Sequence, residues 1–166
     1  MKIRILLLII AMMTGLAACN RGNVTDIERG AEGGVDVTVK LTEQEVNDSI
    51  TNAFTVGANP LLRNPVVELQ SGKIVVNGEH DRLNGSGRVS GSITITVTIQ
   101  NGTILAQISQ ADIEGFDLND ARVAEFNQRL QADFTRRANR DNKELTFKTV
   151  TITDSDIEII FNVKRS

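Results

Sequence analysis

The chain holds a single thiol, and the residues around it favour a reaction at that sulfur. Cys19 follows Leu16, Ala17 and Ala18, and no other cysteine occurs in the 166 residues. A thiolate is a strong nucleophile and therefore a good acceptor for alkylation. Without a second cysteine there is neither an internal disulfide nor a thiolate metal site. We therefore expect the chemistry of Cys19 to be covalent modification.

The segment before Cys19 has the region order of a secretory signal peptide. Lys2 and Arg4 form a basic start, and an uncharged apolar run covers residues 5–13. Small residues then close the segment, as at a signal-peptide cleavage site. The apolar run is too short to span roughly 30 Å of hydrocarbon as a helix. We predict a cleaved signal peptide over residues 1–18.

The four residues Leu-Ala-Ala-Cys resemble the lipobox of bacterial lipoproteins. In that family the thiol receives a diacylglyceryl group, and cleavage leaves the cysteine as the new N-terminus. The resemblance implies fatty acylation of Cys19, with palmitate as the usual label, and lipid anchoring on the extracytoplasmic face of a bacterial cell membrane. Stable anchoring needs two acyl chains or more, which a lipoprotein carries. The alternative is an incidental cysteine beside an ordinary cleavage site.

Other candidates for chemistry are sparse. His80 is the only histidine, so a histidine metal pair is excluded, and the sequence shows no serine triad pattern. His80 and Asp81 would serve as a base and its partner, or as solvated turn residues, and we favour the turn. Asp154 and Asp156 supply fewer oxygen ligands than calcium requires. The sequence therefore predicts no enzyme, no metal site and no cofactor.

The charge composition limits the classes of partner that the protein can bind. Without Lys2 and Arg4, 16 Lys and Arg residues stand against 21 Asp and Glu residues, a net charge of −5. Nucleic acid favours a clearly basic face, so we exclude it as a partner. The basic cluster over residues 136–143 would contact anionic headgroups or, more simply, complement a helix dipole.

Residues 19–34 are rich in glycine and charge and show no periodicity. We expect the modified cysteine there, followed by a flexible tether with an end-to-end distance of about 20 Å. A single folded domain then covers residues 35–166. It opens with an alternating strand over residues 35–41, and Thr42 and Glu45 form a capping box that starts a short helix.

Two tight turns predict hairpins, at residues 71–72 and 101–102, where the second is Asn-Gly. The registers pair apolar with apolar: Leu69 with Ile74, Val67 with Val76, Ile99 with Ile104, Val97 with Ala106, and Ile95 with Ile108. The wet face of the second hairpin pairs Thr96 with Gln107 and Thr94 with Ser109. A longer helix is expected over residues 119–139, and a closing hairpin follows it.

This element order predicts an α+β fold, with a curved antiparallel sheet packed around one long helix and a short N-terminal helix. The order also resembles that of small exported proteins of the TULIP-like type, including phospholipid-binding proteins similar to the mycobacterial mannan-elongation factor. The resemblance covers roughly residues 35–163. It implies a lipid bound between the sheet and the helices, and the candidate lining residues are Val46, Ile50, Phe54, Phe126, Leu130 and Phe134.

Two functions stay open at this point. The first is a membrane-anchored lipoprotein that binds a lipid or another apolar ligand between the sheet and the long helix. The second is a structural or interaction lipoprotein with a solid core that binds another envelope protein, with Thr94, Thr96 and Thr98 as its candidate contact surface. A dry core and a lipid tunnel share the same helical periodicity, because they differ only in whether volume is left empty.

Overall fold

The strands among the described residues form two antiparallel sheets of four strands each. The structure, a computed structural model, describes residues 23–31, 33–55, 61–82, 84–138 and 143–165. One sheet holds both ends of the described chain, namely β1 (Asn23–Arg29), β2 (Val35–Thr42), β7 (Lys143–Ile152) and β8 (Asp156–Arg165). We call it the terminal sheet, and its strand order is β1-β2-β8-β7.

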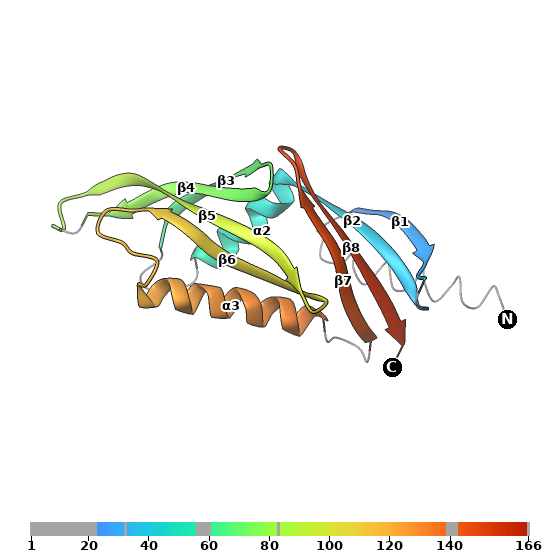
Figure 1. The fold of residues 1–166 in the computed structure, drawn as a ribbon. Coiled ribbons are helices and arrows are strands. Elements are labelled where there is room, and N and C mark those ends of the chain that lie inside the picture. Colours follow the sequence, from blue (N-terminus) through green and yellow to red (C-terminus); the bar gives the residue numbers. More distant parts are fainter. Residues whose placement is uncertain (1–22, 32, 56–60, 83, 139–142, 166) are drawn as a thin grey trace.

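The second sheet, which we call the central sheet, is a meander. It contains β3 (Arg63–Gln70), β4 (Lys73–Asp81), β5 (Arg88–Gln100) and β6 (Thr103–Asp112), and each strand pairs with the next along the chain. Figure 1 shows the two sheets side by side, with the terminal sheet in blue and red. Every strand pairing in both sheets is antiparallel.

Each of the two described helices begins at a side-chain cap, and the cap of the first was predicted. Before α2 (Glu43–Thr55), the Glu45 N–H donates to Thr42 Oγ1 at 3.3 Å and the Thr42 N–H donates to Glu45 Oε2 at 2.8 Å. This reciprocal pair is the predicted capping box. Before α3 (Ala121–Ala138), Asp120 Oδ1 accepts the N–H of Arg122 at 2.9 Å. Both predicted helices are therefore confirmed in position.

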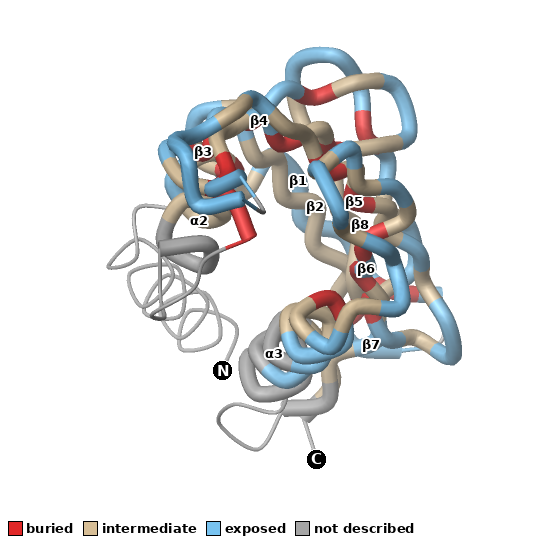
Figure 2. The backbone as a smooth tube through the Cα atoms, turned by 90° about the vertical axis from the view of Figure 1, so that its left-hand side faces the viewer, coloured by how far each residue is buried: buried red, intermediate tan, exposed pale blue. Residues whose placement is uncertain are grey.

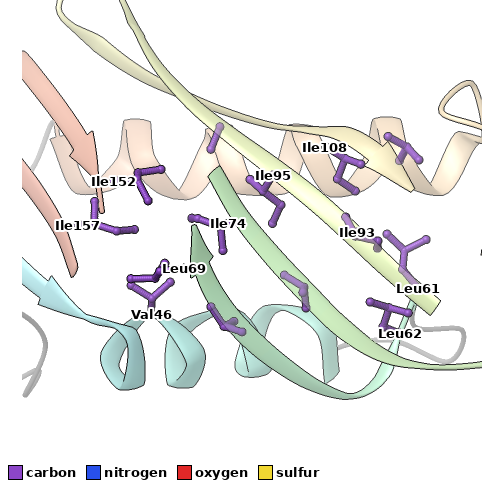
Figure 3. Close-up of a cluster of buried hydrophobic side chains, with 14 residues drawn as sticks. Val46, Leu61, Leu62, Leu69, Ile74, Ile93, Ile95, Ile108, Ile152 and Ile157 are labelled. Atoms are coloured by element: carbon purple, nitrogen blue, oxygen red, sulfur yellow. The ribbon is translucent and has the colours of Figure 1, made fainter. Parts of the chain in front are cut away.

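The helices cover one face of the central sheet. α2 packs beside β3 and α3 packs beside β6, so they lie at opposite edges of that sheet (Figure 2). Val46 of α2 and Val123 of α3 belong to a single hydrophobic cluster that the strands complete. Figure 3 shows the side chains of this cluster between the helices and the strands. The buried core is therefore a layer between helices and sheet.

The two tight-turn hairpins form with the predicted apolar registers. Leu69 pairs with Ile74 in the first, and Ile99 with Ile104 in the second. One wet-face pair was predicted wrongly, because Thr94 lies opposite Gln110 rather than Ser109. A β-bulge between Thr94 and Ile95 shifts the register by one residue. The only mark in the sequence is on β6, where the core-facing residues Ile108 and Ala111 are three positions apart rather than two.

The hairpin turns of the central sheet join the two sheets. The Gly72 N–H donates to the carbonyl oxygen of Ile152 at 3.0 Å, and the Phe147 N–H donates to the carbonyl oxygen of Gly102 at 2.8 Å. Both hydrogen bonds reach β7, the edge strand of the terminal sheet. Ile152 and Ile157 extend the core across this junction, where they point toward Leu69 (Figure 3).

The predicted α+β fold, with a curved sheet around one long helix, is wrong. The protein is mostly β, and neither sheet curls around a helix. The helices instead lie on one face of the central sheet, and the closing hairpin joins β2 in a sheet of its own. Alternating apolar residues show that a strand has a buried face but not which strand lies beside it. The sequence pattern was therefore equally compatible with a single sheet and with two separate sheets.

The predicted tether is also wrong over much of its length. Residues Asn23–Arg29 form β1, which pairs with β2 and returns through a turn in which the Gly33 N–H donates to Gly30 at 3.1 Å. The strand escaped prediction because it is an exposed edge strand with few apolar residues. Residues 1–22, which include the predicted signal peptide, lie outside the described residues.

Candidate functional site

The predicted ligand-lining residues divide into two groups. Val46 is buried at 6% exposure, and Ile50 and Phe126 are half-buried and pack against the same core. The side chains of the remaining candidates, and the predicted acylation site, lie outside the described residues: Phe54, Leu130, Phe134 and Cys19. The structure thus brings three of the helix residues into one hydrophobic cluster. Whether the six candidates line a ligand site stays a prediction.

Side chains of α2 hold the helix to the free edge of β3. Glu43 Oε2 accepts the N–H of Leu69, and Asn47 Oδ1 accepts the N–H of Val67, both at 2.9 Å. Each contact satisfies a backbone donor that has no strand partner. The sequence analysis did not predict these two hydrogen bonds. The signal that could have indicated them is a pair of polar residues four apart, at 43 and 47, beside the apolar stripe of the helix.

A side chain of α3 likewise accepts a backbone hydrogen bond at the opposite edge of the central sheet. Asn127 Oδ1 accepts the N–H of Ile108 on β6 at 3.0 Å. Both outer strands of the central sheet are therefore covered by helices that hydrogen-bond to them. A helix fixed in this way cannot act as a lid without breaking those bonds.

The edges of the terminal sheet are protected differently. The two hairpin turns cover β7, as described above. β1 pairs only with β2 among the described strands, and it carries a bulge between Val24 and Asp26. The Ile27 N–H donates to Asp26 Oδ1 at 2.8 Å, so a side chain occupies a donor on this strand. Bulges and charged residues on an edge strand oppose pairing with another chain.

The outer face of the central sheet carries a group of uncharged polar residues. We call it the neutral patch, and it consists of Asn77, Ser90, Ser92, Thr94, Thr96, Thr98 and Gln107. These residues occupy adjacent positions on β4, β5 and β6, where Asn77 pairs with Ser92 and Thr96 with Gln107. All are exposed or half-buried. The three threonines predicted as a contact surface lie within the patch.

An ion-pair cluster borders the neutral patch at the open end of β4. Arg63 donates to Asp81 Oδ2 from Nη2 at 2.8 Å, and Arg88 Nε lies 3.4 Å from Asp81 Oδ1. The hydrogen bond from Arg63 holds the pKa of Asp81 below its usual range and raises the pKa of Arg63 in return. Asp81 is thus a cross-strand partner of arginines and not the partner of a histidine base.

His80 is not the solvated turn residue that was predicted. It lies on β4 at 6% exposure, and its Nε2 accepts the N–H of Glu114 at 3.2 Å. Nδ1 lies 3.3 Å from the carbonyl oxygen of Asp81. The ring therefore connects β4 to the loop that leads into α3. This arrangement is structural, because both ring nitrogens are engaged with the backbone.

The polar face of the terminal sheet is linked by ion pairs. Lys148 Nζ lies 2.7 Å from Asp36 Oδ2, and Lys40 Nζ lies 3.4 Å from Glu158 Oε2. The hydrogen bond from Lys148, with a second from Asn162, lowers the pKa of Asp36. The first ion pair reaches across β8 from β7 to β2, and the second joins β2 to β8. We call this side of the sheet the acidic face.

The opposite side of the terminal sheet, which we call the apolar face, extends beyond the core. Its far half consists of Val35, Val37, Val39, Leu145, Phe147, Phe161 and Val163, which cross-strand pairing places on one side. All of them are half-buried. The rings of Phe147 and Phe161 pack with their centroids 5.7 Å apart. None of these residues packs against the core cluster.

The described residues form no candidate metal site. Among them, no three His, Asp or Glu side chains lie close enough together to hold an ion. Asp154, weighed as a calcium ligand, instead accepts the N–H of Ser71 through Oδ1 at 2.8 Å. Neither described helix has the length and apolarity that crossing a bilayer requires.

Comparison with known proteins gives no relative: no family model, no curated protein and no solved structure matches this chain.

Proposed function

We propose that the protein is a lipid-anchored lipoprotein on the extracytoplasmic face of a bacterial membrane, and that it binds another envelope protein. The observation that supports the proposal is the buried hydrophobic layer between the helices and the central sheet. Leu62, Val76 and Ile93 are fully buried there, and the helices are hydrogen-bonded to the edges of the sheet. We infer that side chains fill this layer, so that a partner meets the surface of the domain rather than its interior.

The neutral patch is the surface that we assign to the partner. Exposed sheet faces of soluble proteins usually carry many Lys, Glu and Arg residues. The centres of protein interfaces, by contrast, are depleted in charged residues. Thr94, Thr96 and Thr98 also offer hydroxyl groups in a regular row along one strand. The partner surface that fits is therefore neutral, with hydrogen-bonding groups.

A site-specific photo-crosslinker tests this assignment in cells. Placed at Thr96, it should give one discrete adduct, whereas at Lys40, on the terminal sheet, it should give none. Thr96→Arg should prevent the adduct formed from a crosslinker at Thr94, and Thr96→Ser should leave it intact. Equal adducts from Thr96 and Lys40, or no adduct from either position, would contradict the assignment.

The anchor has its own test. Radiolabelled palmitate should enter the wild-type chain, and Cys19→Ser should abolish the incorporation. Mass spectrometry of the mature N-terminus should find a modified cysteine at position 19. An unmodified terminus, produced by ordinary cleavage after Ala18, would refute lipid anchoring without bearing on the neutral patch.

A second candidate function is binding of a lipid or another apolar ligand at the margin of the core. Its support is that Ile50 and Phe126, from the two helices, stay half-buried at the edge of the same cluster that Val150 and Ile159 of the terminal sheet join. Partly exposed apolar residues are suitable contacts for an acyl chain. Mass spectrometry of organic extracts from the purified protein should then find phospholipid that is lost on Phe126→Asp. A lipid-free protein would remove this candidate.

A further inference from the structure

The two faces of the terminal sheet differ in the sign of their charge. Every acidic residue of the four strands whose side chain the structure describes occupies a position on the same face, as the registers place them: Asp26, Glu28, Asp36, Asp156 and Glu158. This is the acidic face, which also carries Lys40, Lys148 and Lys164. The apolar face holds no acidic position within the described strands.

Among the residues whose side chains the structure describes, the apolar face carries one charged residue, and it is basic. Arg29 pairs with Val35, so it occupies that face at the end of the sheet away from the core. Arg29 is exposed. Between Arg29 and the core lie the half-buried valines and phenylalanines of the apolar face. The face therefore combines apolar side chains with a basic residue at its far end.

Few residues separate the predicted anchor from this sheet in the sequence. Residues 20–22 alone separate Cys19 from Asn23, the first residue of β1. A fully extended chain covers at most about 3.6 Å per residue, so the two Cα atoms lie within roughly 14 Å of each other. An acylated Cys19 would thus hold the terminal sheet at the level of the lipid headgroups.

We propose that the apolar face of the terminal sheet lies against the phospholipid bilayer, with Arg29 at the level of anionic headgroups. The inference rests on the proposed anchoring and adds an orientation to it. Apolar residues beside a basic one are typical of surfaces that bind at a membrane interface. The acidic face then points away from the negative membrane surface. A second copy of the chain is a poorer occupant, because the described residues of the apolar face include no acidic partner for Arg29 of the other copy.

Adjacent residues on opposite faces allow a matched test. The chain has no tryptophan, so Val37→Trp and Thr38→Trp each introduce a single fluorophore one position apart, on the apolar and the acidic face. The full-length protein, processed in cells, is reconstituted into vesicles that contain brominated phosphatidylcholine and phosphatidylglycerol. We expect at least twofold quenching of the emission from the Val37→Trp variant and little quenching in Thr38→Trp. Equal quenching of the two variants would overturn the orientation.

A second pair protects the test against misfolding. Phe161→Trp and Ile160→Trp repeat the comparison on β8, and matched thermal unfolding shows that each variant is folded. Bromine near the headgroups should quench more strongly than bromine deep in the chains. Quenching that persists when the brominated lipid is diluted with excess plain lipid means a tightly bound lipid molecule, and overturns bilayer contact.

The two proposals fail separately. Vesicle flotation and mass spectrometry of Cys19 report on the anchor alone. An acylated protein that floats with vesicles but shows no quenching in Val37→Trp or Phe161→Trp retains its anchor and refutes the orientation. An unmodified protein in which the fluorophore of Val37→Trp is nevertheless quenched refutes the anchor and retains the membrane-facing surface.

Discussion

The side-chain nitrogen of Asn162 lies 2.6 Å from Oδ1 of Asp36 and donates a hydrogen bond to it. The two residues are register partners on β8 and β2. The same amide donates to the carbonyl oxygen of Gly33 at 3.1 Å, in the turn between β1 and β2. Lys148 reaches Asp36 from β7. One buried amide and one carboxylate therefore connect β2, β8 and β7 with the turn that leads from β1.

The first prediction concerns the pH dependence of stability. In the folded protein the pKa of Asp36 is lowered by hydrogen bonds from Lys148 and Asn162. Its ionised form therefore stabilises the fold above about pH 4, the ordinary value for an aspartate, and this stabilisation is lost as the pH falls through the folded pKa. We expect Asp36→Asn to be less stable than the wild type at pH 7 and equally stable in acid.

Urea unfolding across the acidic to neutral pH range measures this difference. Lys148→Met removes the first partner of Asp36. It should therefore reduce the change in the free energy of unfolding over the same acidic pH range. Combining both substitutions should cost less than the sum of the two alone, because they act on one interaction. A difference between Asp36→Asn and the wild type that stays constant into strong acid would show that Asp36 does not carry the effect.

The second prediction concerns the side-chain hydrogen bond between α3 and β6. Asn127→Ala leaves the N–H of Ile108 without its acceptor, and the Ile108 side chain is itself buried. An unsatisfied buried donor costs about 1–3 kcal/mol. Urea denaturation should therefore show a lower free energy of unfolding by about that amount. Asn127→Asp keeps an acceptor and should retain most of the stability. Equal losses in the two variants would mean that the amide does not act through this hydrogen bond.

The third prediction concerns His80. His80→Leu removes the acceptor for the Glu114 N–H and should destabilise the protein by about 1–2 kcal/mol. The more specific measurement is hydrogen exchange, in which the Glu114 amide should lose protection while amides in β5 keep theirs. His80→Gln can still offer an acceptor and should restore part of the protection. Unchanged exchange at Glu114 in His80→Leu would contradict the assigned role.

Local features of the sequence were sufficient for the helices and the tight turns. The capping box at Thr42 and Glu45 needs only residues three apart, and the Asn101-Gly102 turn fixes the register of its own hairpin. The pairing of β2 with β8 is different in kind. It joins residues such as Val37 and Phe161, which are far apart in the chain. Alternation marks the buried side of each strand but carries no information about the neighbour.

The candidate site shows the same division. The stripe that contains Val46 and Ile50 predicted a buried helix face, and Val46 is indeed buried. Periodicity could not show whether that face meets a ligand or a core. The different charges of the two faces of the terminal sheet were visible in the sequence within single strands, since Asp36 alternates with Val35 and Val37. The register between distant strands was still needed to show which residues of different strands share a face.

The fourth prediction separates backbone strain from side-chain contact in the two hairpin turns that meet β7. Gly72 and Gly102 have similar positive φ angles, of 79° and 72°. A Cβ at residue 72 would meet no atom within 4 Å, whereas a Cβ at residue 102 would lie 2.8 Å from Thr146 Cγ2. Gly72→Ala should therefore cost about 1–2 kcal/mol through its left-handed backbone alone. Gly102→Ala should cost about 1–3 kcal/mol more through overpacking.

A third variant identifies the source of that excess. Thr146→Ser removes the Cγ2 methyl group and should recover the added cost of Gly102→Ala, while the strain that both alanines share remains. Free energies of unfolding from urea titrations of the single and double variants give the coupling between residues 102 and 146. Equal costs for the two alanine variants would mean that the turn moves away from β7. The hydrogen bond from the Phe147 N–H to Gly102 would then lengthen, and exchange at that amide would accelerate.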